Sequence, residues 1–201
     1  MDILYQDKRI LVAVKPAGVL STDEPGGMPS LLRAALGDEK ACVRTVHRLD
    51  AAVSGVMVFA RTTAAAAQLS KAVQEGTMVK EYVATVHGTP PESGDWTDLL
   101  WKDSTKNKVF VVKRERKGVK KARLEFTRLT AGDTSQVRVR LHTGRSPQLR
   151  VQFASRGFPH VGDHKYGSRD EAQAPMLFSC RISFPWKGQI RAYETLPDWV
   201  K

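Results

Sequence analysis

A short, uninterrupted apolar run constrains the fold of this chain more than any other segment. The run covers residues 51–60 (AAVSGVMVFA) and contains no charged side chain. It is well under the ~20 residues that a membrane-spanning helix needs. An apolar run of strand length, without alternation, is typical of a strand that is covered on both faces. We therefore expect residues 53–59 to form a central strand.

Other strands are indicated by their residue patterns. Residues 10–14 form a second short apolar run, and Lys15-Pro16-Ala17-Gly18 ends it with a turn. Alternation of side-chain character predicts strands at 82–87, 124–129 and 137–141. Two late strands are expected at 176–184 and 189–194.

Few segments are typical of helices. The clearest begins at a cap, Thr62 or Thr63, and carries an apolar stripe that ends at Gly76. We expect Ser30 to cap a short helix ending at Gly37. A third helix is expected after Ser146, with Ser146 as its cap and Pro147 at its first position.

The order of these elements predicts the fold class. Many strands and few helices, without strict alternation, favour an α+β fold with a mixed, largely antiparallel β-sheet core and a few flanking helices. The chain has 201 residues and lacks repeats or a Gly/Ser linker. We therefore expect residues 1–201 to form one domain.

The charge of the chain points to a polyanionic partner. The net charge is +11, and the isoelectric point is near 9.9. Residues 134–162 contain no acidic residue but five arginines. A second basic cluster, Lys113–Arg123, surrounds Gly118. This cluster is consistent with two structures: a solvated hairpin with lysines along its edge, or a ribbon that binds phosphates.

Several function classes are disfavoured. The N-terminus carries Asp2 and Asp7 where a secretion signal would be basic and apolar, and the two cysteines form no disulfide framework. A cytoplasmic location without a membrane is therefore expected. No nucleotide phosphate loop, dinucleotide fingerprint or nucleophile elbow occurs. His160 and His164 lack a third metal ligand nearby and are expected to be a surface pair, so no metal or cofactor is predicted.

One acidic residue stands in an unusual setting. Asp50 ends the segment Val46-His47-Arg48-Leu49-Asp50, directly before the apolar run. The next carboxylate is Glu75, which disfavours a two-carboxylate glycosidase. Taken alone, Asp50 is consistent with a turn former or with an ion-pair partner of a nearby arginine.

Five segments, in order, resemble the RluA-type pseudouridine synthases. Residues 47–60 (HRLDAAVSGVMVFA) are similar to the family pattern H-R-L-D-x-x-T-S-G followed by an apolar strand. The opening ILYQDKRILVAVKPAGVLS is similar to the usual entry strand of the family. The other three are similar to K-x-Y-x-A, T-G-R-x-H-Q-[IL]-R-V and G-x-P-[ILV]-x-G-D-x-x-Y-G; they are residues 80–84, 143–151 and 157–167.

The chain departs from the family pattern at specific positions. Val53 replaces the usual Thr, Pro147 the usual His, and His160 a usual aliphatic residue. Ser179-Cys180 stands where the family often has His-Ala. These departures concern the positioning of substrate more than the reaction.

The resemblance implies an isomerase that converts uridine in RNA to pseudouridine in a central catalytic cleft, without a cofactor. It implies that Asp50 is the catalytic aspartate, that Arg150 pairs with it, and that Tyr82 lies against the uracil. The target nucleotide would be flipped out of its stack, with Arg48 entering the space. Further RNA contacts are expected from Arg145, Lys117, Lys120 and Lys121.

Two other functions remain open on the sequence. The chain is also consistent with a basic RNA-binding protein without catalysis, or with a hydrolase that uses Asp50 with His47 or His142. If the family holds, the substrate is ribosomal or transfer RNA and the protein acts as a monomer, with no obligatory protein partner. The 49 residues before Asp50 leave no room for an S4 RNA-binding module of about 60 residues, so the catalytic domain is expected to bind RNA itself.

Overall fold

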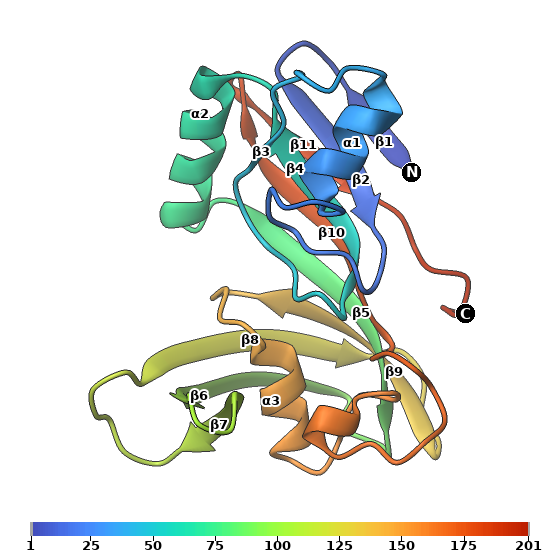
Figure 1. Cartoon of the computed structure of the whole chain (residues 1–201). Coiled ribbons are helices and arrows are strands. Elements are labelled where there is room, and N and C mark those ends of the chain that lie inside the picture. The colour runs from blue at the N-terminus through green and yellow to red at the C-terminus, as the bar shows by residue number, and fades with distance from the viewer. Residues whose placement is uncertain (1, 201) are drawn as a thin grey trace. The chain divides into compact units, whose positions relative to one another are not determined.

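The computed structural model describes residues 2–200, which form two compact units. Unit 1 comprises residues 2–80 and 178–199, and unit 2 comprises residues 81–177. The chain passes from unit 1 to unit 2 near the start of β5 (Val79–His87) and returns at the start of β10 (Leu177–Trp186) (Figure 1). The expectation of one domain over residues 1–201 stays a prediction.

Unit 1 is built on a sheet in which β2, β4 and β10 are adjacent and β1 pairs with β2. Strand β4 pairs with β10 in parallel, whereas β1–β2, β2–β4 and β10–β11 are antiparallel. The short strand β3 also pairs with β4. The strands are β1 (Ile3–Gln6), β2 (Ile10–Lys15), β3 (Arg44–Thr45), β4 (Ser54–Ala60) and β11 (Gln189–Glu194).

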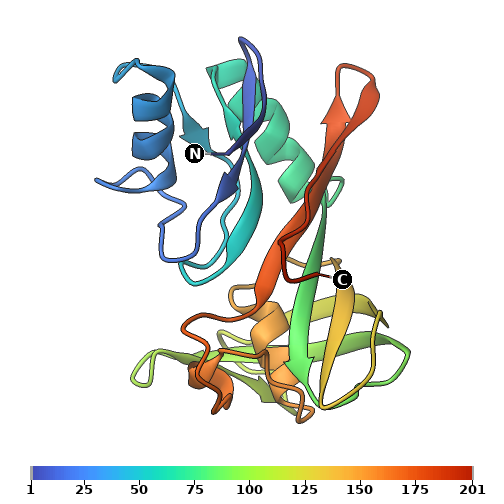
Figure 2. The ribbon, with the colours of Figure 1, turned by 90° about the vertical axis from the view of Figure 1, so that its right-hand side faces the viewer.

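The predicted central strand is confirmed as β4. Residues 55–60 are buried without interruption, because both faces of the strand are covered. Helix α2 (Thr63–Gln74) packs Ala65, Leu69 and Ala72 against one face in a core with Val56 and Val58. Figure 2 shows α1 (Met28–Leu36) and α2 on opposite sides of β2.

The helix starts were predicted with mixed success. Thr62 caps α2, since its side chain accepts a hydrogen bond from the N–H of Ala65 at 3.1 Å. The predicted cap Ser30 is wrong. Gly27 occupies the cap position, three residues before Ser30, and helix α1 begins at Met28. Pro29 lies in the first turn, where its missing N–H costs no hydrogen bond.

Gly55 lies where β4 meets β10. Its φ is +130°, and a Cβ at this position would lie 2.4 Å from both the backbone N and O of Ser179. The parallel pairing joins Gly55 to Ser179 and Ser54 to Phe178. Only glycine permits this close approach of the two backbones.

Unit 2 contains an antiparallel sheet that is covered on one face by a short helix. The order within this unit is β5-β9-β8-β6-β7. Helix α3 packs Val151 with Leu100 and Val109 of the sheet. The elements are β6 (Ser93–Asp103), β7 (Lys108–Val112), β8 (Lys120–Arg128), β9 (Thr134–Leu141), α3 (Gln148–Ala154) and the 3-10 helix η1 (His164–Tyr166).

Two expectations for unit 2 are corrected. Ser146 does not cap α3: Pro147 occupies the cap position, and no side chain caps the helix there. The Lys113–Arg123 cluster is not a hairpin between neighbouring strands. Strands β7 and β8 both pair with β6, so residues 113–119 connect β7 to β8 across the end of β6.

The α+β class with a mixed, largely antiparallel sheet is confirmed. The late strands β10 and β11 are confirmed as well. Within residues 2–200, every helix falls short of the length and apolar character needed to cross a membrane.

Candidate active site

Asp50 lines a pocket of unit 1. The pocket has a volume of about 340 Å³ and lies between two loops, residues 20–24 and 48–51. The walls include Ser21, Glu24 and the exposed Arg48 beside Asp50. The sequence therefore placed Asp50 and Arg48 correctly beside one another, whereas it gave no signal for Glu24.

Hydrogen bonds to the backbone hold the two loops together. The Ser21 hydroxyl donates to the carbonyl of Leu49 at 2.9 Å and accepts from the N–H of Leu49 at 3.1 Å. The Thr45 hydroxyl donates to the carbonyl of Ser21 at 2.8 Å. The backbone just before Asp50 is thus fixed on both sides.

A buried lysine fixes the backbone just after Asp50. The Lys15 ammonium donates to the carbonyls of Pro16, Val19 and Ala51, at 2.8, 2.7 and 3.0 Å. Burial lowers the pKa of Lys15 to about 8, and the charge of Asp50 opposes that shift. The sequence indicated only a turn at Lys15, because its partners are backbone carbonyls that no residue pattern identifies.

His47 lies behind the same loop and is not placed for proton transfer. Its Nε2 accepts a hydrogen bond from the N–H of Val58 at 3.1 Å, and the side chain is buried. Burial, followed by the charge of Lys80, holds the pKa of His47 well below its usual range. A neutral, enclosed ring does not support the hydrolase alternative that uses His47.

Arg150 and Tyr82 lie in unit 2. Arg150, on α3, makes a two-pronged ion pair with Asp163: its Nε donates to Oδ2 and its Nη2 to Oδ1, each at 2.7 Å. The guanidinium also lies 5.2 Å from the centre of the Tyr166 ring. Tyr82 is buried within β5. The pairing of Arg150 with Asp50 and the contact of Tyr82 with uracil stay predictions.

His160 lies beside this ion pair and corrects the predicted surface pair. It is completely buried, with its ring 5.6 Å from that of Phe153, whereas His164 is exposed. Among residues 2–200, neither ring nitrogen of His160 has a hydrogen-bond partner. Burial lowers its pKa to about 4, partly offset by the negative charge of Asp163.

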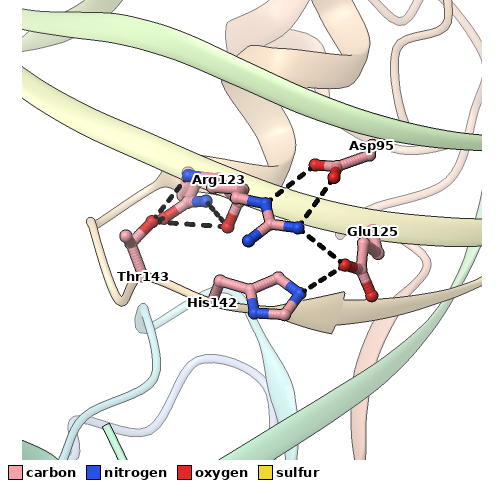
Figure 3. A network of polar contacts seen from close by, with 6 residues as sticks. Asp95, Arg123, Glu125, His142 and Thr143 are labelled. Atoms are coloured by element: carbon pink, nitrogen blue, oxygen red, sulfur yellow. Dashed lines mark hydrogen bonds and ion pairs between the residues drawn. The ribbon is translucent and has the colours of Figure 1, made fainter. Parts of the chain in front are cut away.

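The predicted RNA contacts are all exposed. Arg145, Lys117, Lys120 and Lys121 lie at the surface of unit 2. Arg123 of the same basic cluster is engaged elsewhere, since its guanidinium donates to Asp95 at 3.0 and 2.8 Å and to Glu125 at 3.0 Å (Figure 3). His142 contacts the same Glu125 at 3.0 Å, which gives it a surface ion-pair role.

Within residues 2–200, no three His, Cys, Asp or Glu side chains gather as ligands for a metal ion.

Comparisons with known proteins identify the family of the chain. Residues 9–155 match the family described as RNA pseudouridylate synthase. The chain is 36% identical to the dual-specificity RNA pseudouridine synthase RluA of Escherichia coli (strain K12), over 98% of this chain and 93% of that protein. It is 29% identical to an uncharacterized RNA pseudouridine synthase of Aquifex aeolicus (strain VF5), over 96% of this chain and 68% of that protein.

Solved structures share the fold. The human RNA pseudouridylate synthase domain containing 1 protein superposes with a TM-score of 0.85 at 23% identity, covering 99% of this chain and 84% of that one. The human domain containing 4 protein gives 0.83 at 22% identity, covering 98% and 89%.

Proposed function

The chain belongs to the RNA pseudouridylate synthase family, and from this premise we propose that Asp50 is the carboxylate that acts on the target uridine. The enzyme is an isomerase of RNA. The reaction breaks the bond between C1′ of the ribose and N1 of uracil and forms a bond between C1′ and C5. The C5 proton leaves and N1 gains a proton, so the reaction needs no oxidant or reductant.

The pocket around Asp50 is the observation that carries this assignment. An ionised carboxylate can attack C1′ or remove a proton from C2′, and both routes need a fixed carboxylate beside the ribose. Ser21 and Lys15 hold the backbone on the two sides of Asp50. The Lys15 ammonium also attracts the Asp50 carboxylate.

Arg150 and Tyr82 complete the proposed site. Asp163 holds the Arg150 guanidinium through two hydrogen bonds. The resemblance of residues 143–151 to the family pattern supports the proposal that Arg150 pairs with Asp50. Tyr82 offers a planar ring against which a detached uracil can stack. Arg48, exposed at the rim of the pocket, is proposed to fill the stack that the flipped nucleotide leaves.

The RNA is proposed to be ribosomal or transfer RNA. The curated relative in Escherichia coli is named a dual-specificity enzyme. Exposed basic residues support contacts to the phosphates, and we assign them to Arg145, Lys117, Lys120 and Lys121. Mapping pseudouridine across cellular RNA with and without the gene would identify the target.

An asparagine at position 50 tests the catalytic assignment. Asp50→Asn keeps the size of the side chain but removes the charge, so we expect kcat on a target RNA to fall by at least about 10²-fold. RNA affinity should remain. Glu39→Gln, at an exposed carboxylate of the same unit, is the matched control and should convert RNA normally. Full conversion by Asp50→Asn would refute the assignment. A thermal melt of the variant shows whether it is folded, and so distinguishes a loss of catalysis from a loss of structure.

We further propose that the enzyme acts in the cytoplasm as a monomer. The two cysteines of the sequence offer no disulfide framework, which supports a reducing compartment. Sedimentation velocity at micromolar concentration should give a single species near 22.3 kDa. A dimer that persists at micromolar concentration would contradict the proposal.

A further inference from the structure

The sheet of unit 2 has an open face that carries aromatic side chains. Trp101 on β6 and Phe110 on β7 are direct cross-strand neighbours, so both side chains lie on the same face. The next residues along each strand, Leu100 and Val109, lie on the opposite face and pack with α3. Trp101 and Phe110 are only half-buried, although aromatic side chains of this size are usually covered.

An arginine lies over Trp101. The guanidinium carbon of Arg116 is 4.2 Å from the centre of the Trp101 ring. Arg116 comes from the segment that connects β7 to β8, and the side chain is exposed. The guanidinium therefore contacts tryptophan while part of it stays accessible to a ligand. Among the described residues, no carboxylate lies within ion-pair distance of Arg116.

A second arginine–tryptophan pair in unit 2 provides a contrast. Arg156 lies 4.3 Å from the ring centre of Trp96, but two hydrogen bonds of 2.8 and 3.1 Å tie it to Asp98. Trp96 packs with Phe126 and so belongs to the covered face. The charge of Arg156 is thus compensated by Asp98 within the fold, whereas no carboxylate among the described residues compensates that of Arg116.

Two lysines lie near Phe110, and one of them, Lys108, also lies 5.1 Å from the centre of the Tyr166 ring. The ammonium groups of Lys106 and Lys108 lie 5.9 and 5.8 Å from the centre of its ring. Both lysines are close enough to contact a phosphate next to a base that lies on this ring. Flat groups flanked by positive charge are the arrangement that binds unpaired nucleotides without reading their sequence.

We propose that Trp101, Arg116 and Phe110 form a stacking platform for unpaired bases of the RNA substrate. This inference rests on the family's action on RNA and deepens it by assigning a second contact surface, on the face of the sheet away from α3. A base stacks on the accessible part of the Arg116 guanidinium, which Trp101 holds in place, and a neighbouring base stacks on Phe110. The excess of positive charge favours RNA over a protein partner.

Arg116→Lys tests the platform because it keeps the charge and removes the plane. We expect affinity for a mixed-sequence single-stranded RNA to fall about tenfold, since one stacking contact is lost. The dependence of affinity on salt should stay unchanged, because the number of charges is the same. Trp101→Leu and Phe110→Leu should each weaken binding to a similar extent, and Trp101→Leu should abolish the quenching of tryptophan fluorescence by RNA.

Arg156→Lys is the matched control and should bind RNA as the unchanged protein does. Over a range of target RNA concentrations, Arg116→Lys should raise KM without changing kcat, which distinguishes the platform from the proposed catalytic site. Normal affinity and quenching in Arg116→Lys would overturn the platform while leaving the proposed role of Asp50 intact. Conversion by Asp50→Asn would refute that role and leave the platform standing. Displacement of RNA by polyglutamate at equal charge would show a general anion surface and would also overturn the platform.

Discussion

At the scale of single residues, Lys15 shows how much of the site depends on a side chain that does not react. Its ammonium is excluded from water, and three backbone carbonyls replace the hydration that is lost. One of them belongs to Ala51, the neighbour of Asp50. The N–H of Gly18 donates to the same carbonyl at 2.7 Å, so the turn after β2 is bound twice to the loop that carries Asp50.

Lys15→Met is expected to disturb both stability and catalysis. Methionine fills similar space but removes the donor from the carbonyls of Pro16 and Val19, while the Ala51 carbonyl keeps only the N–H of Gly18. We expect this loss to cost about 3 kcal/mol of unfolding free energy. The freed Ala51 backbone should also lower kcat more than it raises KM. Urea unfolding and initial rates on target RNA measure the two effects. Lys71→Met, at an exposed lysine of α2, should change neither, and an unaltered Lys15→Met would contradict this role.

His160 makes stability depend on acid. The folded protein holds its pKa at about 4, whereas the unfolded chain has the ordinary value near 6.5. Between these values the unfolded chain binds a proton that the folded chain does not, so folding stability falls as the pH drops from 6.5 to 4. The pKa difference corresponds to roughly 3 kcal/mol.

His160→Val should reduce this acid sensitivity. Valine is close in character to the aliphatic residues usual at this position of the family, and it removes the titrating group. Urea unfolding at pH 7.5, 5.5 and 4.5 should show a smaller loss of stability in the variant than in the unchanged protein. His47 and the carboxylates titrate in both proteins, so the difference between the two isolates His160. Parallel pH curves would refute the prediction.

At the scale of elements, the pairing of β4 with β10 depends on one glycine. The parallel ladder contains two residue pairs, and Gly55 belongs to one of them. Gly55→Ala would place a Cβ 2.4 Å from the Ser179 backbone, at a φ of +130°. We expect a loss of about 3 kcal/mol or more in unfolding free energy.

Gly76→Ala provides the control for backbone conformation alone. Gly76 follows α2 with a φ of +71°, but no atom lies within 4 Å of its Cβ position. Its substitution should cost only about 1 kcal/mol. Equal losses at Gly55 and Gly76 in urea unfolding would show that the approach of β10 is not what requires glycine.

The elements that the sequence predicted best are those with local signals. The uninterrupted apolar run predicted β4, and the Thr62 cap predicted the start of α2, because periodicity and capping are written in neighbouring residues. Ser30 and Ser146 were wrong as caps, since Gly27 and Pro147 occupy the cap positions and neither helix has a side-chain cap. Helix starts with several capping candidates are decided by the packing of the whole chain.

The site divides in the same way. Asp50 and Arg48 were predicted because they belong to a contiguous motif, and the pocket contains both. Lys15 and Asp163 were missed as functional residues because their importance lies in their partners: carbonyls for one and Arg150 for the other. His160 was expected at the surface because a Pro/Gly loop is usually exposed, yet its backbone pairs with Val86 of β5 and carries the ring inward.

At the scale of the whole molecule, the chain carries a net charge of +11, and its basic side chains differ in whether a carboxylate pairs with them. Several arginines are neutralised by carboxylates within the fold; they include Arg33, Arg123, Arg138, Arg150 and Arg156. In contrast, Lys117, Lys120 and Lys121 lie within ion-pair distance of no carboxylate among the described residues. Positive charge that no carboxylate compensates is therefore present where the segment after β7 meets β8.

Charge reversal at Lys117, Lys120 and Lys121 tests whether this concentration, and not the total charge, binds RNA. Each phosphate contact to a single strand contributes about 0.7 to the slope of log affinity against log salt, so losing three should lower the slope by about 2. The control triple, Lys8, Lys40 and Lys71 to Glu, lies on exposed positions of unit 1 and changes the net charge equally. Affinities measured from 50 to 300 mM salt should separate the two triples. Contacts at specific lysines would appear as a smaller slope in the Lys117, Lys120 and Lys121 variant alone. If both variants instead lose affinity equally and keep the slope of the unchanged protein, RNA is attracted by the overall electrostatic field of the protein.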